Sequence, residues 1–119
     1  MEISLYDTNG KPVMYIADDG ETIYNWDGYA VCYLVDEKIY GWRGKHLGWF
    51  INDIIYDEDG YRLGYTREAS PRIVYTEWTK WTKKTMWTKH SRYTAKHQPI
   101  LKNSESSYDL ASYLGQDKT

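Results

Sequence analysis

Aliphatic and aromatic residues recur in four copies of one pattern between residues 5 and 65. Each copy reads aliphatic-Tyr, three turn-forming residues, Gly, two further residues and then aliphatic-x-aromatic, and the copies occupy residues 5–15, 23–33, 39–49 and 55–65. The closing alternation has the two-residue period of a β-strand, and the glycine suits the positive φ of a tight corner. Each copy therefore predicts a β-hairpin, and the four together predict an eight-strand antiparallel meander.

A flat sheet of eight strands leaves two open edges, and a single hairpin cannot bury its own apolar face. We therefore expect an all-β fold in which four repeated antiparallel hairpins close around a pseudo-four-fold axis. Equivalent positions then gather around that axis, and we expect one of two sets of rings to line a shallow pocket there: Tyr6, Tyr24, Tyr40 and Tyr56, or Tyr15, Tyr33, Trp49 and Tyr65.

A second pattern, with a period of three, follows the hairpins. One register is aromatic, the next carries hydroxyls from Thr76 to Thr94, and the third is largely basic; the aromatic register holds Tyr75, Trp78, Trp81, Trp87 and Tyr93, and the basic one holds Lys80, Lys83, Lys89 and Arg92. In an α-helix each register would drift around the axis, and in a strand it would alternate between faces. A three-fold polyproline II screw keeps each register on one edge, so the pattern predicts an extended arm.

The end of the chain predicts a short helix over residues 106–114. Ser106 and Asp109 have a spacing similar to a capping box, Leu110 and Leu114 share one face, and Gly115 follows as the stop. The chain then divides into a four-hairpin domain at residues 1–70, a basic aromatic arm at residues 71–102 that packs on it, and a short C-terminal helix and tail at residues 103–119.

Two stretches resemble the four-fold beta-flower proteins, small bacterial proteins built from four repeated hairpins. They are the run GKHLGWF at residues 44–50 and the pattern IYDxDGxxxGY at residues 55–65, and residues 98–101 and 104–110 are similar to later parts of that family. The resemblance covers nearly the whole chain and implies the four-hairpin fold, but it carries over no activity. The richness of the arm in Trp, Thr and Lys departs from the family's usual pattern.

Charge divides the chain at the same place as the patterns do. Residues 1–66 carry five basic and twelve acidic side chains, a net charge of −7, whereas residues 72–102 carry eight basic side chains and Glu77 alone, a net charge of +7. Two interpretations remain open: the arm binds an acidic partner such as a phosphate backbone, or it lies on its own acidic body.

The aromatic register of the arm also has two interpretations. Trp78, Trp81 and Trp87 either pack on the hairpins and complete a thin core, or stack on bases while the basic residues meet phosphates. Both can hold at once, with the aromatic edge facing the body and the basic register facing outward.

Composition narrows the remaining classes of function. The longest apolar run, at residues 29–35, is far below the roughly 20 residues that span a bilayer, and no secretory leader is recognisable, so we expect a cytoplasmic protein with no membrane partner. Cys32 is the only cysteine and the three histidines belong to no nucleophile motif, so we expect no enzyme and no catalytic residue. The run Asp57-x-Asp59-Gly60 is better explained by a turn than by a calcium loop, and we expect neither a metal nor a cofactor.

The candidate ligand-binding residues fall into two groups that combine cations with rings. The third hairpin contributes Trp42, Arg43, Lys45, His46 and Trp49, and the arm contributes Lys80, Lys83, Lys89 and Arg92. The alternative for the hairpin group is a solvated turn flanked by core rings. We predict a non-enzymatic binding module for an anionic, base-bearing ligand, either a nucleotide, including a sequestered signalling nucleotide, or single-stranded nucleic acid. The alternative is a protein-interaction or self-assembly module, with the chain as a homo-oligomer and no small-molecule ligand.

Overall fold

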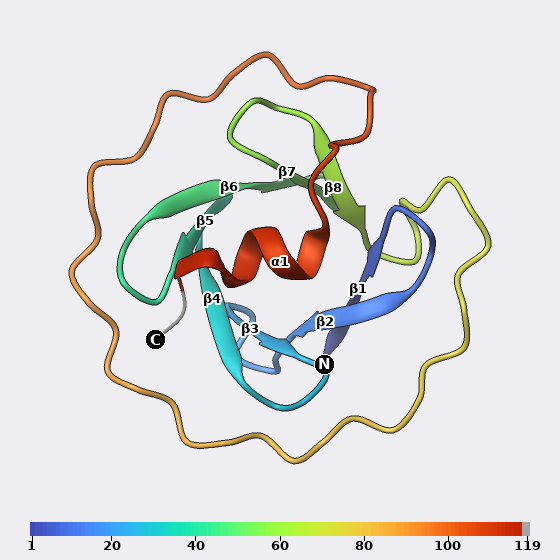
Figure 1. Ribbon diagram of the computed structural model, residues 1–119, viewed down its shortest axis with the longest axis horizontal. Helices are drawn as coiled ribbons and strands as arrows, with labels where there is room; N and C mark the ends of the chain where they lie inside the picture. The colour runs from blue at the N-terminus through green and yellow to red at the C-terminus, as the bar shows by residue number, and fades with distance from the viewer. Residues whose placement is uncertain (118–119) are drawn as a thin grey trace.

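The computed structural model describes residues 1–117 and contains eight strands that form one closed antiparallel barrel (Figure 1). The strands are β1 (Ile3–Asp7), β2 (Pro12–Ile16), β3 (Thr22–Asn25), β4 (Ala30–Val35), β5 (Lys38–Gly41), β6 (His46–Ile51), β7 (Ile54–Tyr56) and β8 (Arg62–Tyr65). Each strand pairs with the next in sequence, and β1 also pairs with β8. The predicted fold of four hairpins closed into a ring is therefore confirmed.

The interior of the barrel is aliphatic. Leu5, Ile23, Ile39 and Ile55 are equivalent positions of the four hairpins, and all four belong to one buried cluster. Because neighbouring residues of a strand point to opposite faces, the tyrosine that follows each of them lies on the outer face of the barrel. The expectation that tyrosine and tryptophan rings line a pocket on the axis is wrong for this reason.

Each hairpin corner is a tight turn that ends in a glycine of positive φ, and these glycines are Gly10, Gly28, Gly44 and Gly60. In three of the hairpins an Asp or Asn side chain before the turn accepts hydrogen bonds from backbone N–H groups of the turn, as Asp7 does from Asn9 and Lys11. The third hairpin has Gly41 at that position. There the Asp117 carboxylate accepts from the Lys45 N–H at 2.9 Å, and a Cβ on Gly41 would lie 2.2 Å from the Asp117 Cβ. A residue from the end of the chain thus completes the turn that the third hairpin cannot complete by itself.

A short helix, α1 (Leu110–Leu114), lies across one mouth of the barrel and buries Leu110, Tyr113 and Leu114 (Figure 1). The helix begins later than predicted, because its N-cap is Asp109, whose carboxylate accepts from the Ser112 N–H, whereas the Ser106 hydroxyl donates to Asp57. Gly115 ends the α-helix, but the chain continues as a 3₁₀ turn, η1 (Gly115–Asp117). Residues 118 and 119 of the predicted tail lie outside the described residues.

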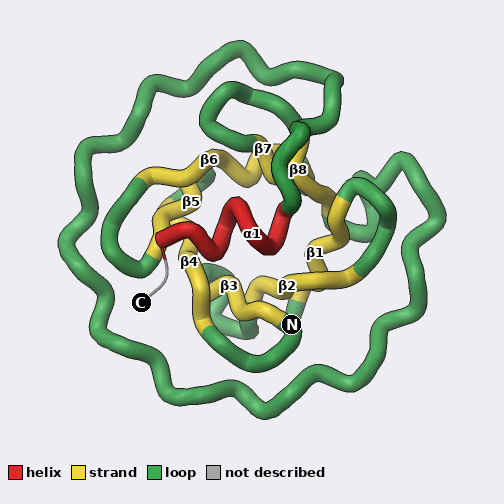
Figure 2. The backbone as a smooth tube through the Cα atoms, in the orientation of Figure 1, coloured by secondary structure: helices red, strands yellow, loops and turns green. Residues whose placement is uncertain are grey.

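The arm, residues 71–102, contains no helix or strand and encircles the barrel as a single extended loop (Figure 2). It is attached to the four hairpin corners at intervals of nine residues. The N–H groups of Tyr75, Lys84, Tyr93 and Lys102 donate to the carbonyl oxygens of Gly10, Gly28, Gly44 and Gly60, each at 2.9 Å. The arm is therefore a nine-residue repeat in phase with the hairpins, and the predicted triplet pattern passes through three turns of its screw between one corner and the next.

The dimensions of the ring explain the interval of nine residues. The molecule measures 37 by 36 Å across the barrel axis. Nine extended residues at about 3.1 Å each cover roughly 28 Å, about a quarter of the perimeter of such a ring. A helical arm of the same length would span less than half that distance. The start of the arm is tied to the segment that follows it, because the Arg72 guanidinium donates to both carboxylate oxygens of Glu105 at 2.6 and 3.0 Å.

Candidate functional site

Four pairs of rings lie on the outer face of the barrel, one at each seam where two hairpins meet. The two residues of a pair lie directly opposite each other on neighbouring strands, and the pairs are Tyr15 with Tyr24, Tyr33 with Tyr40, Trp49 with Tyr56, and Tyr65 with Tyr6. At the first two seams the rings are stacked, with centroids 5.6 and 6.1 Å apart, and a tryptophan packs edge-on against the pair. These two seams are aromatic cages that open toward the arm.

The first cage holds two cations of the arm. The Lys80 ammonium lies 4.6 Å from the centre of the Tyr15 ring and 5.2 Å from that of Trp26. The Lys83 ammonium lies 5.5 Å from both Tyr15 and Tyr24. A cation at these distances from a ring face is attracted by the negative face of the ring, so the cage stabilises the arm at this seam.

The second cage repeats the first, nine residues further along the arm. The Lys89 ammonium lies 4.3 Å from the centre of the Tyr33 ring and 5.3 Å from that of Trp42, and the Arg92 guanidinium lies 5.6 Å from Tyr40. The four basic residues selected from the sequence are therefore two equivalent pairs. The structure brings Trp42 of the hairpin group next to Lys89 of the arm group.

Carboxylates of the barrel also meet the cations of the arm. Glu2 pairs with Lys80 at 3.0 Å and with Lys83 at 2.6 Å, and the hydrogen bond from Lys83 lowers the pKa of Glu2. Lys89 pairs with Glu21 at 3.7 Å, and Lys96 pairs with Glu58. The arm thus lies on its own acidic body, one of the two interpretations of the charge pattern. Binding of an external acidic partner stays a prediction.

The aromatic register of the arm is largely exposed, although the Trp78 ring also packs against Trp26 with centroids 5.8 Å apart. We call the rings of Tyr75, Trp78, Trp81, Trp87 and Tyr93 the aromatic belt. Trp78, Trp81 and Trp87 are 47, 67 and 73% exposed, whereas Trp26, Trp42 and Trp49 of the barrel are buried. The expectation that the arm's tryptophans complete the core, with the basic residues outward, is therefore wrong. The barrel already places its own rings at the seams, and its Trp26 and Trp42 indoles donate to the carbonyl oxygens of Trp78 and Trp87.

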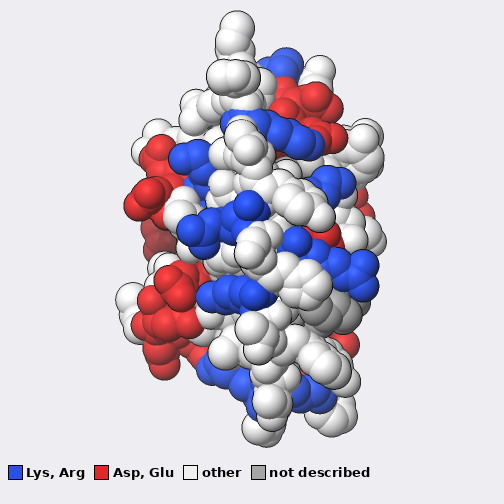
Figure 3. All heavy atoms as spheres, turned by 90° about the vertical axis from the view of Figure 1, so that its left-hand side faces the viewer, with Lys and Arg blue, Asp and Glu red and all other residues white. Residues whose placement is uncertain are grey.

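Cationic side chains lie beside the belt rather than only beneath it. On one face of the molecule, Lys and Arg side chains form a band along the arm, with uncharged atoms between them and acidic groups at its margin (Figure 3). The Lys84 ammonium lies 5.9 Å from the exposed Trp81 ring and 4.6 Å from Tyr29. Within residues 1–117, neither Lys84 nor Arg92 takes part in an ion pair. The belt combines exposed rings with accessible positive charge.

The hairpin group of candidate residues is mostly enclosed. Trp42, His46 and Trp49 are each 2% exposed. The Lys45 ammonium donates to the Gln116 side chain at 2.7 Å, and the Arg43 N–H donates to the Asp117 carbonyl oxygen at 3.2 Å. The C-terminal turn and the arm therefore occupy the space around this corner.

His46 joins the arm to the third hairpin. Its Nδ1 accepts from the Lys96 N–H at 2.9 Å, so the neutral ring carries its proton on Nε2, which donates to the Gly48 carbonyl oxygen at 3.0 Å. Tyr40 and Trp49 pack against the ring. Burial lowers the pKa of His46, with a contribution from the positive charges of Lys96 and Lys38. Both ring nitrogens are thus engaged in holding the arm.

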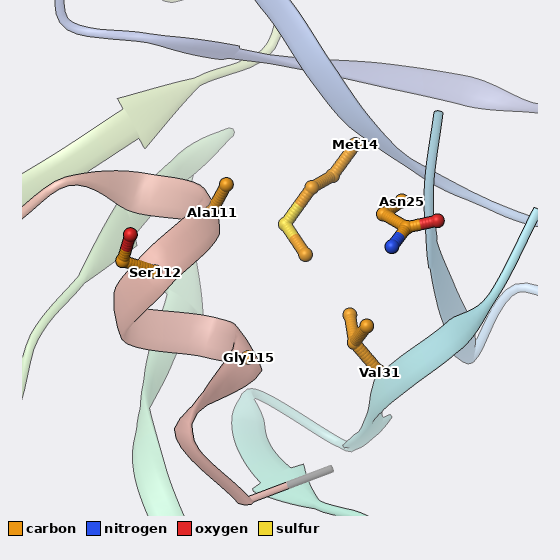
Figure 4. Close-up of a pocket in the computed structure, with 6 residues that line it drawn as sticks. All are labelled: Met14, Asn25, Val31, Ala111, Ser112 and Gly115. Carbon is orange, nitrogen blue, oxygen red and sulfur yellow. The ribbon is translucent and has the colours of Figure 1, made fainter. Parts of the chain in front are cut away.

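A hollow of about 270 Å³ lies between α1 and the first two hairpins (Figure 4). Met14 of β2, Asn25 of β3 and Val31 of β4 line the side of this gap opposite the helix, and Met14 extends toward the helix (Figure 4). None of the candidate residues named from the sequence lines it. In the described part of the chain, no group of three His, Cys, Asp or Glu residues is placed to hold a metal ion, and no helix has the length and apolar character needed to cross a membrane.

The candidate list from the sequence included the cations of the arm but omitted the rings of the belt. The triplet register identifies the rings in the sequence, but whether these rings are exposed depends on which edge of the arm contacts the barrel. Pairing the arm with the hairpins at nine-residue intervals would have placed Lys80 and Lys89 at equivalent seams, and the aromatic register on the opposite edge.

Comparison with known proteins gives one match. A family model described as 4-fold beta flower protein matches residues 3–114, a range that runs from β1 through the arm to the end of α1. No curated protein and no solved structure matches the chain.

Proposed function

The chain belongs to the 4-fold beta flower family, and from the arrangement of its arm on that fold we propose that it is a non-enzymatic binding module for an anionic, base-bearing ligand. The ligand class comprises nucleotides, including a sequestered signalling nucleotide, and single-stranded nucleic acid. The ligand-binding surface is the aromatic belt together with the cations beside it.

The exposure of the belt is the observation that carries this proposal. Large rings are normally buried, and a set of exposed rings along one edge is typical of a contact surface. The arm keeps three tryptophans in solvent while its carbonyl oxygens bind the indoles of the barrel. Aromatic rings stack on bases of any sequence, and neighbouring cations attract the phosphates. Lys84, next to Trp81, provides this combination at one point of the belt.

A non-enzymatic role agrees with the state of the reactive side chains. Cys32 is buried, and burial raises the pKa of its thiol, which disfavours the thiolate that acts as a nucleophile. His46 uses both ring nitrogens in hydrogen bonds to the backbone. We propose that these groups serve the fold.

A second candidate function is a protein-interaction or self-assembly module. The observation that favours it is the neutralisation of the arm: Lys80 and Lys83 pair with Glu2, and Lys89 pairs with Glu21. Each such pair reduces the charge available to phosphates and leaves the rings as the main feature of the outer edge. Exposed Trp and Tyr are also enriched at protein interfaces.

Salt dependence separates the two functions. We would titrate the protein with nucleotides and with oligothymidylate at 25 and 200 mM NaCl and follow the quenching of tryptophan fluorescence. Binding that involves phosphates should weaken steeply as salt increases, because counterions are released on binding. Sedimentation of the protein alone over the same salt range tests self-assembly, which an aromatic interface would maintain at high salt.

A matched pair of variants assigns the binding to the belt. Trp81→Ala with Trp87→Ala removes two exposed rings, and Ile100→Ala removes an even more exposed apolar side chain of the arm that lies outside the belt. We expect the double variant to lose oligothymidylate binding and Ile100→Ala to keep it. Equal binding by both variants would contradict the proposal, as would a complex that forms equally well at both salt concentrations.

A further inference from the structure

The belt presents its rings one after another along an extended backbone. Trp78 and Trp81 are three residues apart and Trp81 and Trp87 are six apart, with Tyr75 and Tyr93 at the two ends. Resting on the proposed function, we infer that the ligand is a single strand of nucleic acid that lies along the belt, rather than a free nucleotide.

The spacing of the rings carries this inference. Three extended residues cover about 9 Å, and six cover about 19 Å. A single base placed flat on one ring does not reach the next ring at such distances. A free nucleotide can therefore use one ring, whereas a strand places successive bases on several rings at once. Each further stack is then an intramolecular event and multiplies the affinity.

The belt is held in place before any ligand arrives. The hydrogen bonds to Gly28 and Gly44 fix the backbone at Lys84 and Tyr93, and the Trp26 and Trp42 indoles fix it at Trp78 and Trp87. The two aromatic cages hold the side chains between these points. A preorganised backbone loses little freedom on binding, which favours a repeated contact with a flexible strand.

Charge complementarity points to the same ligand. Residues 72–102 carry a net charge of +7, whereas the hairpins carry −7. Side chains of Lys83, Lys89 and Lys96 remain 35 to 44% exposed in spite of their ion pairs. Positive charge is thus distributed along the whole belt, as a strand with one phosphate per nucleotide requires, rather than gathered at one point.

Several hollows in the described part of the chain lie away from the belt. Four of them, of about 220 to 320 Å³, lie at α1, at the N-terminus and beside the fourth hairpin. None of the four is lined by a ring of the belt. A nucleotide in any of them would not meet the rings on which the proposed function rests.

A length series tests the inference. We would titrate the full chain at 25 mM NaCl with thymidine monophosphate and with dT4, dT8, dT12 and dT16, and follow tryptophan fluorescence. We expect the affinity to rise by at least 100-fold from the monophosphate to dT12, since each added stack contributes on the order of tenfold. A duplex of the same length, whose bases are not free to stack on the belt, should bind at least tenfold more weakly than dT12.

Variants distinguish a belt from a local site. Trp81→Ala with Trp87→Ala should reduce dT12 affinity by roughly 100-fold while changing monophosphate affinity less than tenfold. Ile100→Ala should change neither, and its circular dichroism and that of the double variant should match the parent chain. Equal affinities for the monophosphate and dT12 would overturn the inference and leave the proposed function standing. Failure of every base-bearing probe to bind at 25 mM NaCl would overturn both.

Discussion

Two glycines of similar backbone conformation provide a direct test of how the arm is seated. Gly28 and Gly20 have φ values of +92° and +75°, so alanine is strained at both positions. A Cβ on Gly28 would lie 2.2 Å from the carbonyl oxygen of Thr82 in the arm, whereas a Cβ on Gly20 would meet nothing within 4 Å. Gly28→Ala should therefore displace the arm, and Gly20→Ala is its matched control.

The difference between the two variants follows from the contacts. The positive φ costs each variant about 1–2 kcal/mol. Displacement of the arm at the second hairpin also breaks the bond from the Lys84 N–H to Gly28 and the bond from the Trp81 N–H to Trp26, at 2.9 and 3.1 Å. Each contributes about 1 kcal/mol net. We expect Gly28→Ala to lower the free energy of unfolding by about 2 kcal/mol more than Gly20→Ala does.

Urea denaturation followed by tryptophan fluorescence measures this difference, and trypsin reports where it arises. Cleavage after Lys83 and Lys84 should accelerate in Gly28→Ala and stay unchanged in Gly20→Ala, because a displaced segment is open to protease. Gly44→Ala should behave like Gly28→Ala with cleavage moved to Arg92, since its Cβ would lie 2.1 Å from the Ser91 carbonyl oxygen. Equal loss of stability in the Gly20 and Gly28 variants, with no change in cleavage, would refute the seating of the arm on the corners.

Two further predictions concern the other attachments of the arm and the chain end. Burial lowers the pKa of His46 in the folded chain, so the unfolded chain binds the proton more readily as the pH falls. The contribution of His46 to the free energy of unfolding should therefore be fully present above the ordinary pKa of about 6.5 and decrease below it. Urea denaturation at pH 7.5 and 5.5 should show this loss, and a His46→Gln variant with the same pH dependence as the parent would contradict it. Asp117→Gly removes the acceptor for the Lys45 N–H and should destabilise the third hairpin by about 1 kcal/mol. It also removes the Asp117 Cβ, so Gly41→Asp in that background has room to rebuild the turn used in the first hairpin and should restore most of the loss. A double variant no more stable than Asp117→Gly in urea denaturation would count against this account.

The four hairpins could be predicted from sequence because each copy specifies its structure locally. The two-residue alternation fixes the strands, and the corner glycines fix the turns at a φ that other residues avoid. The start of α1 was predicted wrongly because two nearby residues were suitable caps. Asp109 caps the helix because the Ser106 hydroxyl is engaged elsewhere: it donates a hydrogen bond to the carboxylate of Asp57, 49 residues away in the sequence.

The direction in which the arm's side chains point could not be predicted from the arm alone. The triplet pattern establishes that rings and cations occupy different edges, but not which edge faces the barrel. Buried rings at the seams decide it: stacked tyrosines such as Tyr33 and Tyr40 already fill the space that Trp87 would need, and they offer a favourable surface to Lys89. The Gly41 and Asp117 pairing was equally hidden, because Gly41 on its own indicates only a missing side chain.

The length of the repeat and the chemistry of the belt depend on each other. Nine is a multiple of three, so an extended three-fold arm returns to the same orientation at every hairpin corner and presents the same registers to every seam. An interval of eight or ten residues would rotate the arm by a third of a turn at each corner. The register that carries the cations would then face the barrel at one seam and point away from it at the next. Lys80 and Lys89 occupy equivalent cages because the interval is nine. The interval of nine also places Trp78 and Trp87 on the same outer edge of the arm. The perimeter of the barrel, which sets that interval, therefore decides whether the rings that bind the proposed strand lie along one edge.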